Sequence, residues 1–137
     1  MRTWRASSLV VDASAIVELL RRTTAGRQVA RRLQGAALAA PAHLDAEVLS
    51  ALARLARDNP ADEPLVGPRL ALLARAPIQR YPCPPLLIEA WEMRANVAVR
   101  DALYVALSRR LGAPLLTADH RLARSTAGMA GVVVQTV

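Results

Sequence analysis

Acidic residues at four separate places in the chain have the type and the setting for ligand chemistry: Asp12, Glu47, Asp101 and Asp119. Asp12 directly follows the apolar run 8–11, and Asp119 comes just after the apolar run 114–117. Several carboxylates that converge at one place repel one another strongly, so such a cluster normally needs a cation. Hard oxygen ligands favour Mg²⁺ or Mn²⁺. Taken jointly, the four acids predict a divalent-metal site.

Each acid also has a purely structural interpretation. Asp12 and Asp119 can cap the helices that follow them, and Asp101 can be a first-turn acid that favours the helix dipole. Glu47 can be a solvated residue on the flank of an amphipathic helix. Asp45 lies equally near the other edge of that helix's apolar stripe, so periodicity alone does not choose between Asp45 and Glu47.

The elements that must position these acids alternate between strands and helices. Short apolar runs predict strands at 8–11, 36–40, 78–81, 114–117 and 132–134. Helical periodicity predicts helices at 14–22, 24–33, 43–58, 63–75, 86–95 and 100–111, with a short helix from His120. Gly67 and Pro68 indicate a kink or a broken start in the fourth of these. The alternation predicts an α/β fold in one domain, 1–137, with a parallel sheet covered on both faces. In such sheets, ligands bind outside the carboxyl ends of the strands, where Asp12 and Asp119 stand.

Composition narrows the classes of function. The chain has 137 residues, of which 53% are hydrophobic, enough for one real core. All 18 basic residues are arginine and outnumber 11 acidic residues, which suggests a polyanionic partner. The absence of lysine excludes a Walker A loop, and the single Cys83 excludes an internal disulfide. The apolar stretch 9–20 is interrupted by two acids and is too short to span a membrane, so we expect a cytoplasmic protein.

Four segments carry a resemblance to a known family: VVDASA (10–15), LDAEVLSAL (44–52), RDALYVAL (100–107) and LLTADHRL (115–122). In this order, and over nearly the whole chain, they resemble the PIN-domain nucleases and, more narrowly, the VapC toxins of bacterial toxin–antitoxin pairs. The stretches DALYVAL and LLTAD are specific in combination and weak apart. Arg100 departs from the family, whose members often carry an aromatic or other residue before the aspartate.

The resemblance implies a doubly wound parallel sheet of about five strands flanked by helices. It implies Mg²⁺-dependent cleavage of RNA, with Mn²⁺ as a substitute, and inhibition by a cognate VapB-type antitoxin. It also implies a homodimer, with the antitoxin lying in a groove beside the active site. The residues that match the family's acidic quartet are Asp12, Glu47, Asp101 and Asp119. Asp45 does not match, whereas Ser14 and Thr117 match small polar positions that support the quartet.

Other functions stay open at this point. One is a PIN-domain nuclease of RNA processing that is not a toxin, and another is a basic RNA-binding module without catalysis. A phosphatase that uses Asp12 as nucleophile fits poorly, because Ser14 stands where a second aspartate is wanted and lysine is absent. A serine hydrolase fits poorly because Ser14 has no evident base partner.

Two surfaces are expected from the same patterns. Arginines on the early helices are candidates for contacts to a polyanion: Arg21, Arg22, Arg31 and Arg32. Apolar residues of two segments are candidates for exposed patches that a partner covers: Ile16, Val17, Leu19 and Leu20, and Leu86, Leu87 and Trp91.

Overall fold

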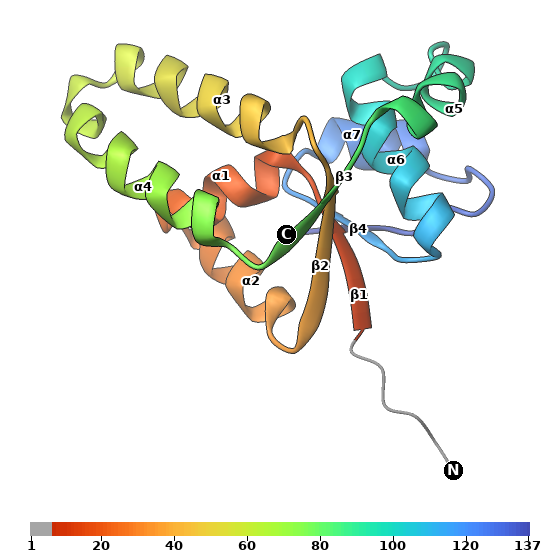
Figure 1. Ribbon diagram of the computed structural model, residues 1–137, viewed down its shortest axis with the longest axis horizontal. Coiled ribbons are helices and arrows are strands. Elements are labelled where there is room, and N and C mark those ends of the chain that lie inside the picture. Colours follow the sequence, from red (N-terminus) through yellow and green to blue (C-terminus); the bar gives the residue numbers. More distant parts are fainter. Residues whose placement is uncertain (1–6) are drawn as a thin grey trace.

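The computed structural model describes residues 7–137, and within that range five parallel strands form one sheet. The strands are β1 (Ser7–Val11), β2 (Ala36–Pro41), β3 (Ile78–Tyr81), β4 (Leu115–Thr117) and β5 (Val134–Thr136). Their order is β3-β2-β1-β4-β5, so the first strand is central and the chain winds outward from it twice (Figure 1). The expected doubly wound sheet is confirmed.

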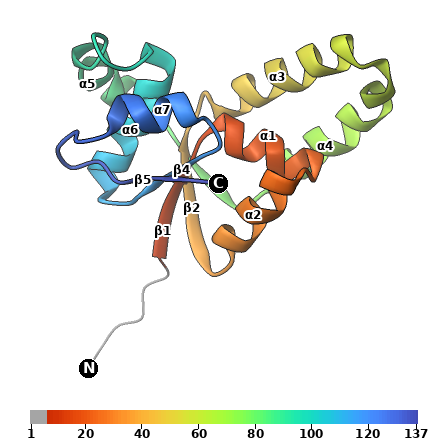
Figure 2. The ribbon, with the colours of Figure 1, turned by 180° about the vertical axis from the view of Figure 1, so that it is seen from behind.

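Helices cover both faces of the sheet, as a parallel sheet requires. One face carries α1 (Ala13–Arg21), α2 (Thr24–Leu33), α3 (Leu44–Asp58) and α4 (Glu63–Arg75). The other carries α5 (Leu87–Glu92), α6 (Val99–Leu111) and α7 (His120–Thr126) (Figures 1 and 2). Short 3₁₀ turns, Pro60–Asp62 and Pro84–Leu86, precede α4 and α5. The hairpin of α3 and α4 projects beyond the sheet.

The core lies where β1 and β4 pair at the centre of the sheet. Val10 pairs with Leu115 and Val11 with Leu116, and all four side chains are fully buried. Helix α6 is buried along most of its length, which explains its nearly unbroken apolar sequence. The expectation of exposed patches is wrong for Ile16, Val17 and Leu86, which lie in this core. Leu87 and Trp91 are exposed, as expected.

Beyond shifts of one residue at their ends, three elements differ from those expected. Helix α4 runs without interruption through Pro68, whose missing N–H would have bonded only to Pro64 in the first turn. Helix α5 ends at Glu92, because Arg94 and Asn96 enter turns instead. The last strand begins two residues later than expected, because a turn that closes at Val132 and contains Gly131 at φ 74° occupies the preceding residues.

None of the helices in residues 7–137 has the length and apolar character needed to cross a membrane.

Candidate active site

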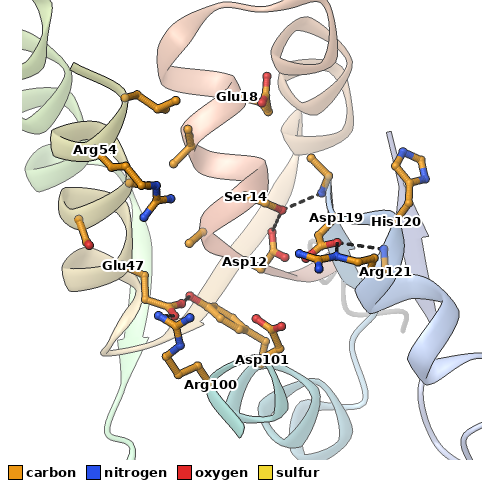
Figure 3. A pocket seen from close by; sticks show the side chains of 17 residues that line it. Asp12, Ser14, Glu18, Glu47, Arg54, Arg100, Asp101, Asp119, His120 and Arg121 are labelled. Atoms are coloured by element: carbon orange, nitrogen blue, oxygen red, sulfur yellow. Dashed lines mark hydrogen bonds and ion pairs between the residues drawn. The ribbon is translucent and has the colours of Figure 1, made fainter. Parts of the chain in front are cut away.

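The four predicted carboxylates, together with a fifth from Glu18 of α1, line one pocket of about 530 Å³ at the carboxyl edge of the sheet (Figure 3). Asp12 follows β1, Glu47 lies on α3, Asp101 lies in the first turn of α6, and Asp119 follows β4. Strands β1 and β4 are neighbours at the point where the strand order reverses, which is where doubly wound sheets bind ligands. All four acids that the sequence singled out therefore line the same pocket.

Asp12 is almost fully buried and held by three donors. Its Oδ1 accepts from the backbone N–H of Ala15 at 2.9 Å and from Ser14 Oγ at 2.8 Å, and its Oδ2 accepts from Thr117 Oγ1. Burial raises the pKa of Asp12 to about 6; the three hydrogen bonds oppose that rise, and the charge of Asp101 adds to it. Asp12 is thus the N-cap of α1 and a pocket residue at once.

Ser14 and Thr117 join the ends of β1 and β4 beneath the pocket. Their hydroxyl oxygens lie 3.1 Å apart. Ser14 Oγ accepts from the backbone N–H of Ala118 at 3.0 Å, and Thr117 Oγ1 accepts from that of Asp119 at 2.9 Å. Asp119 in turn caps α7 through Oδ1, which accepts from the N–H of Arg121 at 2.9 Å. Thr117 thereby links the carboxylate of Asp12 to the backbone of Asp119.

Glu47 and Asp45, which periodicity left undecided, face different surroundings. Glu47 lines the pocket, and its Oε1 accepts a hydrogen bond of 2.6 Å from the Tyr104 hydroxyl. Asp45 lies outside this pocket and binds Arg80 of β3 through both oxygens, at 2.9 and 3.2 Å. The structure therefore brings Glu47, and not Asp45, to the other three acids.

The pKa of Asp101 depends on the charges of its acidic neighbours. Its pKa is raised above the usual value, first by burial and then by the carboxylates of Glu47 and Asp119, while Arg100 and His43 oppose the rise. Because Asp101 also raises the pKa of Asp12, all four acids are electrostatically coupled. Such coupling favours any positive charge that enters the pocket.

The donor set suits a hard divalent cation. The acidic lining supplies carboxylate oxygens and no sulfur, which is the ligand chemistry of Mg²⁺ and Mn²⁺. In the part of the chain that the structure describes, no three His, Cys, Asp or Glu side chains stand close enough to hold one ion as they are. Mutual repulsion accounts for carboxylates that surround the pocket without converging.

Comparisons with known proteins show the family of the chain. The PIN domain family model matches residues 9–127. Ribonuclease VapC3 of Mycobacterium tuberculosis is 46% identical over 118 residues, which cover 85% of this chain and 86% of that protein. Ribonuclease VapC12 of the same organism is 42% identical over 85% of this chain and 91% of its own length. The chain belongs to the VapC family of PIN-domain ribonucleases.

Solved structures share the fold at low identity. A VapBC2 complex from Rickettsia felis, bound to a DNA fragment from its promoter, superposes with a TM-score of 0.67 at 11% identity, covering 94% of this chain and 98% of that one. PAE2754 from Pyrobaculum aerophilum gives 0.66 at 21% identity, covering 93% and 89%. A toxin–antitoxin complex from Klebsiella pneumoniae gives 0.58 at 14% identity, covering 91% and 95%. The PIN fold is thus common to all of them.

Several pocket residues of this VapC-family chain were not predicted from the sequence. Arg54 and Arg121 line the pocket beside Arg100, whereas the four arginines proposed from the early helices do not. Arg21 instead pairs with Asp62 at 3.4 Å, and Arg32 donates to Gln135 at 2.7 Å. Tyr104, which the sequence indicated only as apolar, also lines the pocket. Its position three residues after Asp101 places both on one helix face, a signal that was available.

Proposed function

We propose that this chain is the toxin of a type II toxin–antitoxin pair and that it cleaves cellular RNA as a metal-dependent endoribonuclease. The observation that carries the proposal is the single pocket lined by Asp12, Glu47, Asp101 and Asp119. The names of its relatives, ribonucleases VapC3 and VapC12, support RNA as the substrate. The toxin–antitoxin complexes among proteins of the same fold support the toxin role.

In this proposal the four carboxylates hold Mg²⁺, for which Mn²⁺ can substitute. When bound, such a cation lowers the pKa of a water and neutralises charge that develops on the phosphate. The chain's own contribution is orientation. Ser14 Oγ and Thr117 Oγ1 donate to opposite oxygens of Asp12 and so fix the plane of its carboxylate. At the start of α7, the backbone N–H groups of Arg121 and Leu122 both donate to Oδ1 of Asp119 and hold that oxygen in place.

Arginines at the rim of the pocket would bind the phosphates of the RNA. Arg54 on α3, Arg100 on α6 and Arg121 on α7 come from three sides of the acidic lining (Figure 3). The side chains of Arg100 and Arg121 are more than four-fifths exposed, so they are free to meet a polyanion. Positive charge around an acidic centre offsets the repulsion between carboxylates and a phosphate backbone.

A VapB-type antitoxin would inhibit the enzyme by covering this pocket. The lining continues away from the acids between α1 and α3, where the half-buried Ala51 and Leu55 offer apolar surface. A peptide segment laid along these residues would end over the carboxylates, where an arginine of the antitoxin could pair with them. An antitoxin that bound tightly and left cleavage unchanged would contradict this mode of inhibition.

We also propose that the toxin is a homodimer. Helix α5 exposes Leu87, Ile88 and Trp91 side by side within two turns, and Ile88 is 73% exposed. An apolar patch on so short a helix is typical of a surface that another protein chain covers.

The proposed function is tested by mapping the 5′ ends of cellular RNA after induced expression without the antitoxin. We expect new, discrete 5′ ends with the wild-type protein and with Asp45→Asn, and none with Asp101→Asn. The purified wild-type protein should lose cleavage in excess EDTA and regain it with Mg²⁺ or Mn²⁺. RNA binding without new 5′ ends would favour a non-catalytic RNA-binding module. Cleavage that persists in EDTA would contradict the metal mechanism.

A further inference from the structure

The Tyr104 hydroxyl is a buried polar group that the mechanism above does not use. Tyr104 is 1% exposed, and its hydroxyl donates to Glu47 Oε1 at 2.6 Å. That distance lies in the range of charge-assisted O–H···O⁻ hydrogen bonds, which are about twice as strong as neutral ones. Burial and the hydrogen bond to Glu47 raise the pKa of Tyr104 above its usual value, so the phenol keeps its proton and remains a donor.

His43 lies near the same carboxylate oxygen. Its Nε2 lies 3.0 Å from the carbonyl oxygen of Arg100 and 3.4 Å from Glu47 Oε1. Both neighbours are acceptors, so Nε2 is the ring nitrogen that carries a proton here. The imidazole also packs on the Tyr104 ring, with centroids 4.7 Å apart and planes tilted by 39°. The two side chains therefore form one unit around Oε1.

The other oxygen of Glu47 has a different environment. Oε2 lies 3.8 Å from the guanidinium of Arg100, whose side chain is 81% exposed and easily displaced. Because Oε1 already accepts the hydrogen bond from Tyr104, Oε2 is the oxygen that Glu47 can more readily offer to a cation in the pocket. We infer that Tyr104, supported by His43, is a positioning residue that holds Glu47 in the pocket so that Oε2 would be presented to a divalent cation.

The inference rests on the proposed metal site. It gives the hydroxyl of Tyr104 a role that an apolar side chain at position 104 could not fill. Glu47 and Asp101 repel each other, and the repulsion would turn an unrestrained Glu47 outward. Tyr104 lies one turn after Asp101 on α6 and holds Glu47 on α3, so one hydrogen bond sets the separation of two carboxylates. Because Tyr104 holds Glu47 in place beforehand, binding of the cation does not have to order this side chain first.

The test is Mn²⁺ binding to the metal-free protein, measured by titration calorimetry without RNA. Tyr104→Phe removes only the hydroxyl, and we expect about 10- to 100-fold weaker binding, as is typical when an outer partner of a ligand is lost. The matched control is Tyr81→Phe, which changes the chain's other tyrosine, outside this pocket. It should bind Mn²⁺ like the wild type. Thermal unfolding of each variant checks that the fold is retained.

A double-mutant cycle separates positioning from a general structural effect. If Tyr104 acts through Glu47, adding Tyr104→Phe to Glu47→Gln should weaken Mn²⁺ binding no further. An equal further loss in the Glu47→Gln background would overturn the inference, as would wild-type affinity in Tyr104→Phe. Wild-type affinity in Glu47→Gln, with a loss in Asp12→Asn, would overturn the inference and leave the metal site standing. Wild-type affinity in both Glu47→Gln and Asp12→Asn would overturn the proposed function itself.

Discussion

At Asp12, helix capping and ligand chemistry depend on different properties of one carboxylate. Asp12→Asn keeps an oxygen that can accept from the backbone N–H of Ala15, so the cap of α1 should survive. The amide is a poor ligand for a hard cation. We expect RNA cleavage to fall by more than about 100-fold, beyond the loss typical of outer-shell changes. A cleavage assay at fixed Mg²⁺, paired with thermal unfolding, measures both; full activity in this variant would contradict the role given to Asp12.

The raised pKa of Asp12 predicts how the stability of the metal-free protein depends on pH. The folded-state pKa is about 6 against 3.8 for the unfolded chain, so the folded state holds this proton over a wider range. Its contribution to stability is therefore complete below pH 3.8 and is lost as pH rises to about 6. A shift of about two units corresponds to a loss on the order of 3 kcal/mol.

Urea unfolding from pH 4 to pH 7.5 in EDTA measures this loss, with Asp12→Asn as the comparison. The variant should be less sensitive to pH over this interval, because its amide does not titrate. The remaining slope belongs to other groups, among them Asp101, whose raised pKa acts in the same direction. Identical pH profiles for the wild type and the variant would contradict the assignment to Asp12.

Substitutions at Glu47 and Asp45 should have different effects, one on activity and the other on folding stability. We expect Glu47→Gln to remove cleavage, because it takes a carboxylate from the pocket. Asp45→Asn should cleave like the wild type and lose about 1 kcal/mol of folding stability, because the Asp45–Arg80 pair is half-exposed. Cleavage assays of the two variants measure the effect on activity, and urea unfolding measures the effect on folding stability. The reverse ranking in the cleavage assay would mean that Asp45 is the functional acid.

Only part of the site could be predicted from the sequence, because patterns in a sequence report on neighbouring residues. Asp12 and Asp119 stand at the ends of apolar runs, which place them at the sheet edge without any tertiary information. The choice between Glu47 and Asp45 depended on family resemblance, because the partner that holds Asp45 elsewhere, Arg80, lies on a later strand. The pocket position of Arg54 depends on how α3 crosses α1, and no periodicity in the sequence encodes that crossing.

At the scale of elements, Gly26 sets the distance between α1 and α2. A Cβ at this position would lie 2.0 Å from the backbone carbonyl oxygen of Glu18, so the two helices must separate to accommodate it. We expect Gly26→Ala to cost about 1–3 kcal/mol, the usual range for overpacking. Gly67→Ala is the control: it lies in α4 with open space around it, and alanine should stabilise that helix by about 0.5–1 kcal/mol. Denaturant unfolding that ranked the two variants equally would contradict this packing argument.

The elements themselves were largely predictable, and their ends were less so. Every expected strand and helix exists, because buried apolar runs and helical periodicity are properties of consecutive residues. The burial of Ile16 and Val17 could not be read from the same pattern, because the packing of α3 and α4 beside α1 decides it. The start of the last strand was predicted two residues too early. Val132 to Val134 are three consecutive valines, so the sequence does not show which of them begins the strand.

At the scale of the whole molecule, the proposed homodimer should depend on α5. Ile88→Glu places a charge in the centre of the exposed apolar patch, so we expect the protein to become a monomer at micromolar concentration. Leu65→Glu, at a 46% exposed position on α4, is the matched control and should remain a dimer. Light scattering coupled to size exclusion measures both. A monomeric wild-type protein would contradict the dimer, and a dimeric Ile88→Glu would exclude this surface.

The strand order also dictates when the proposed site can exist during synthesis. β1 lies at the centre of the sheet and is made well before its neighbour β4. Until β4 has left the ribosome, one edge of β1 is unpaired and Asp12 has neither Thr117 nor Asp119 beside it. A growing chain therefore lacks a complete acidic pocket until β4 and Asp119 have been made. A ribonuclease assembled in this order cannot attack the message that encodes it until the ribosome has read past the codons of β4.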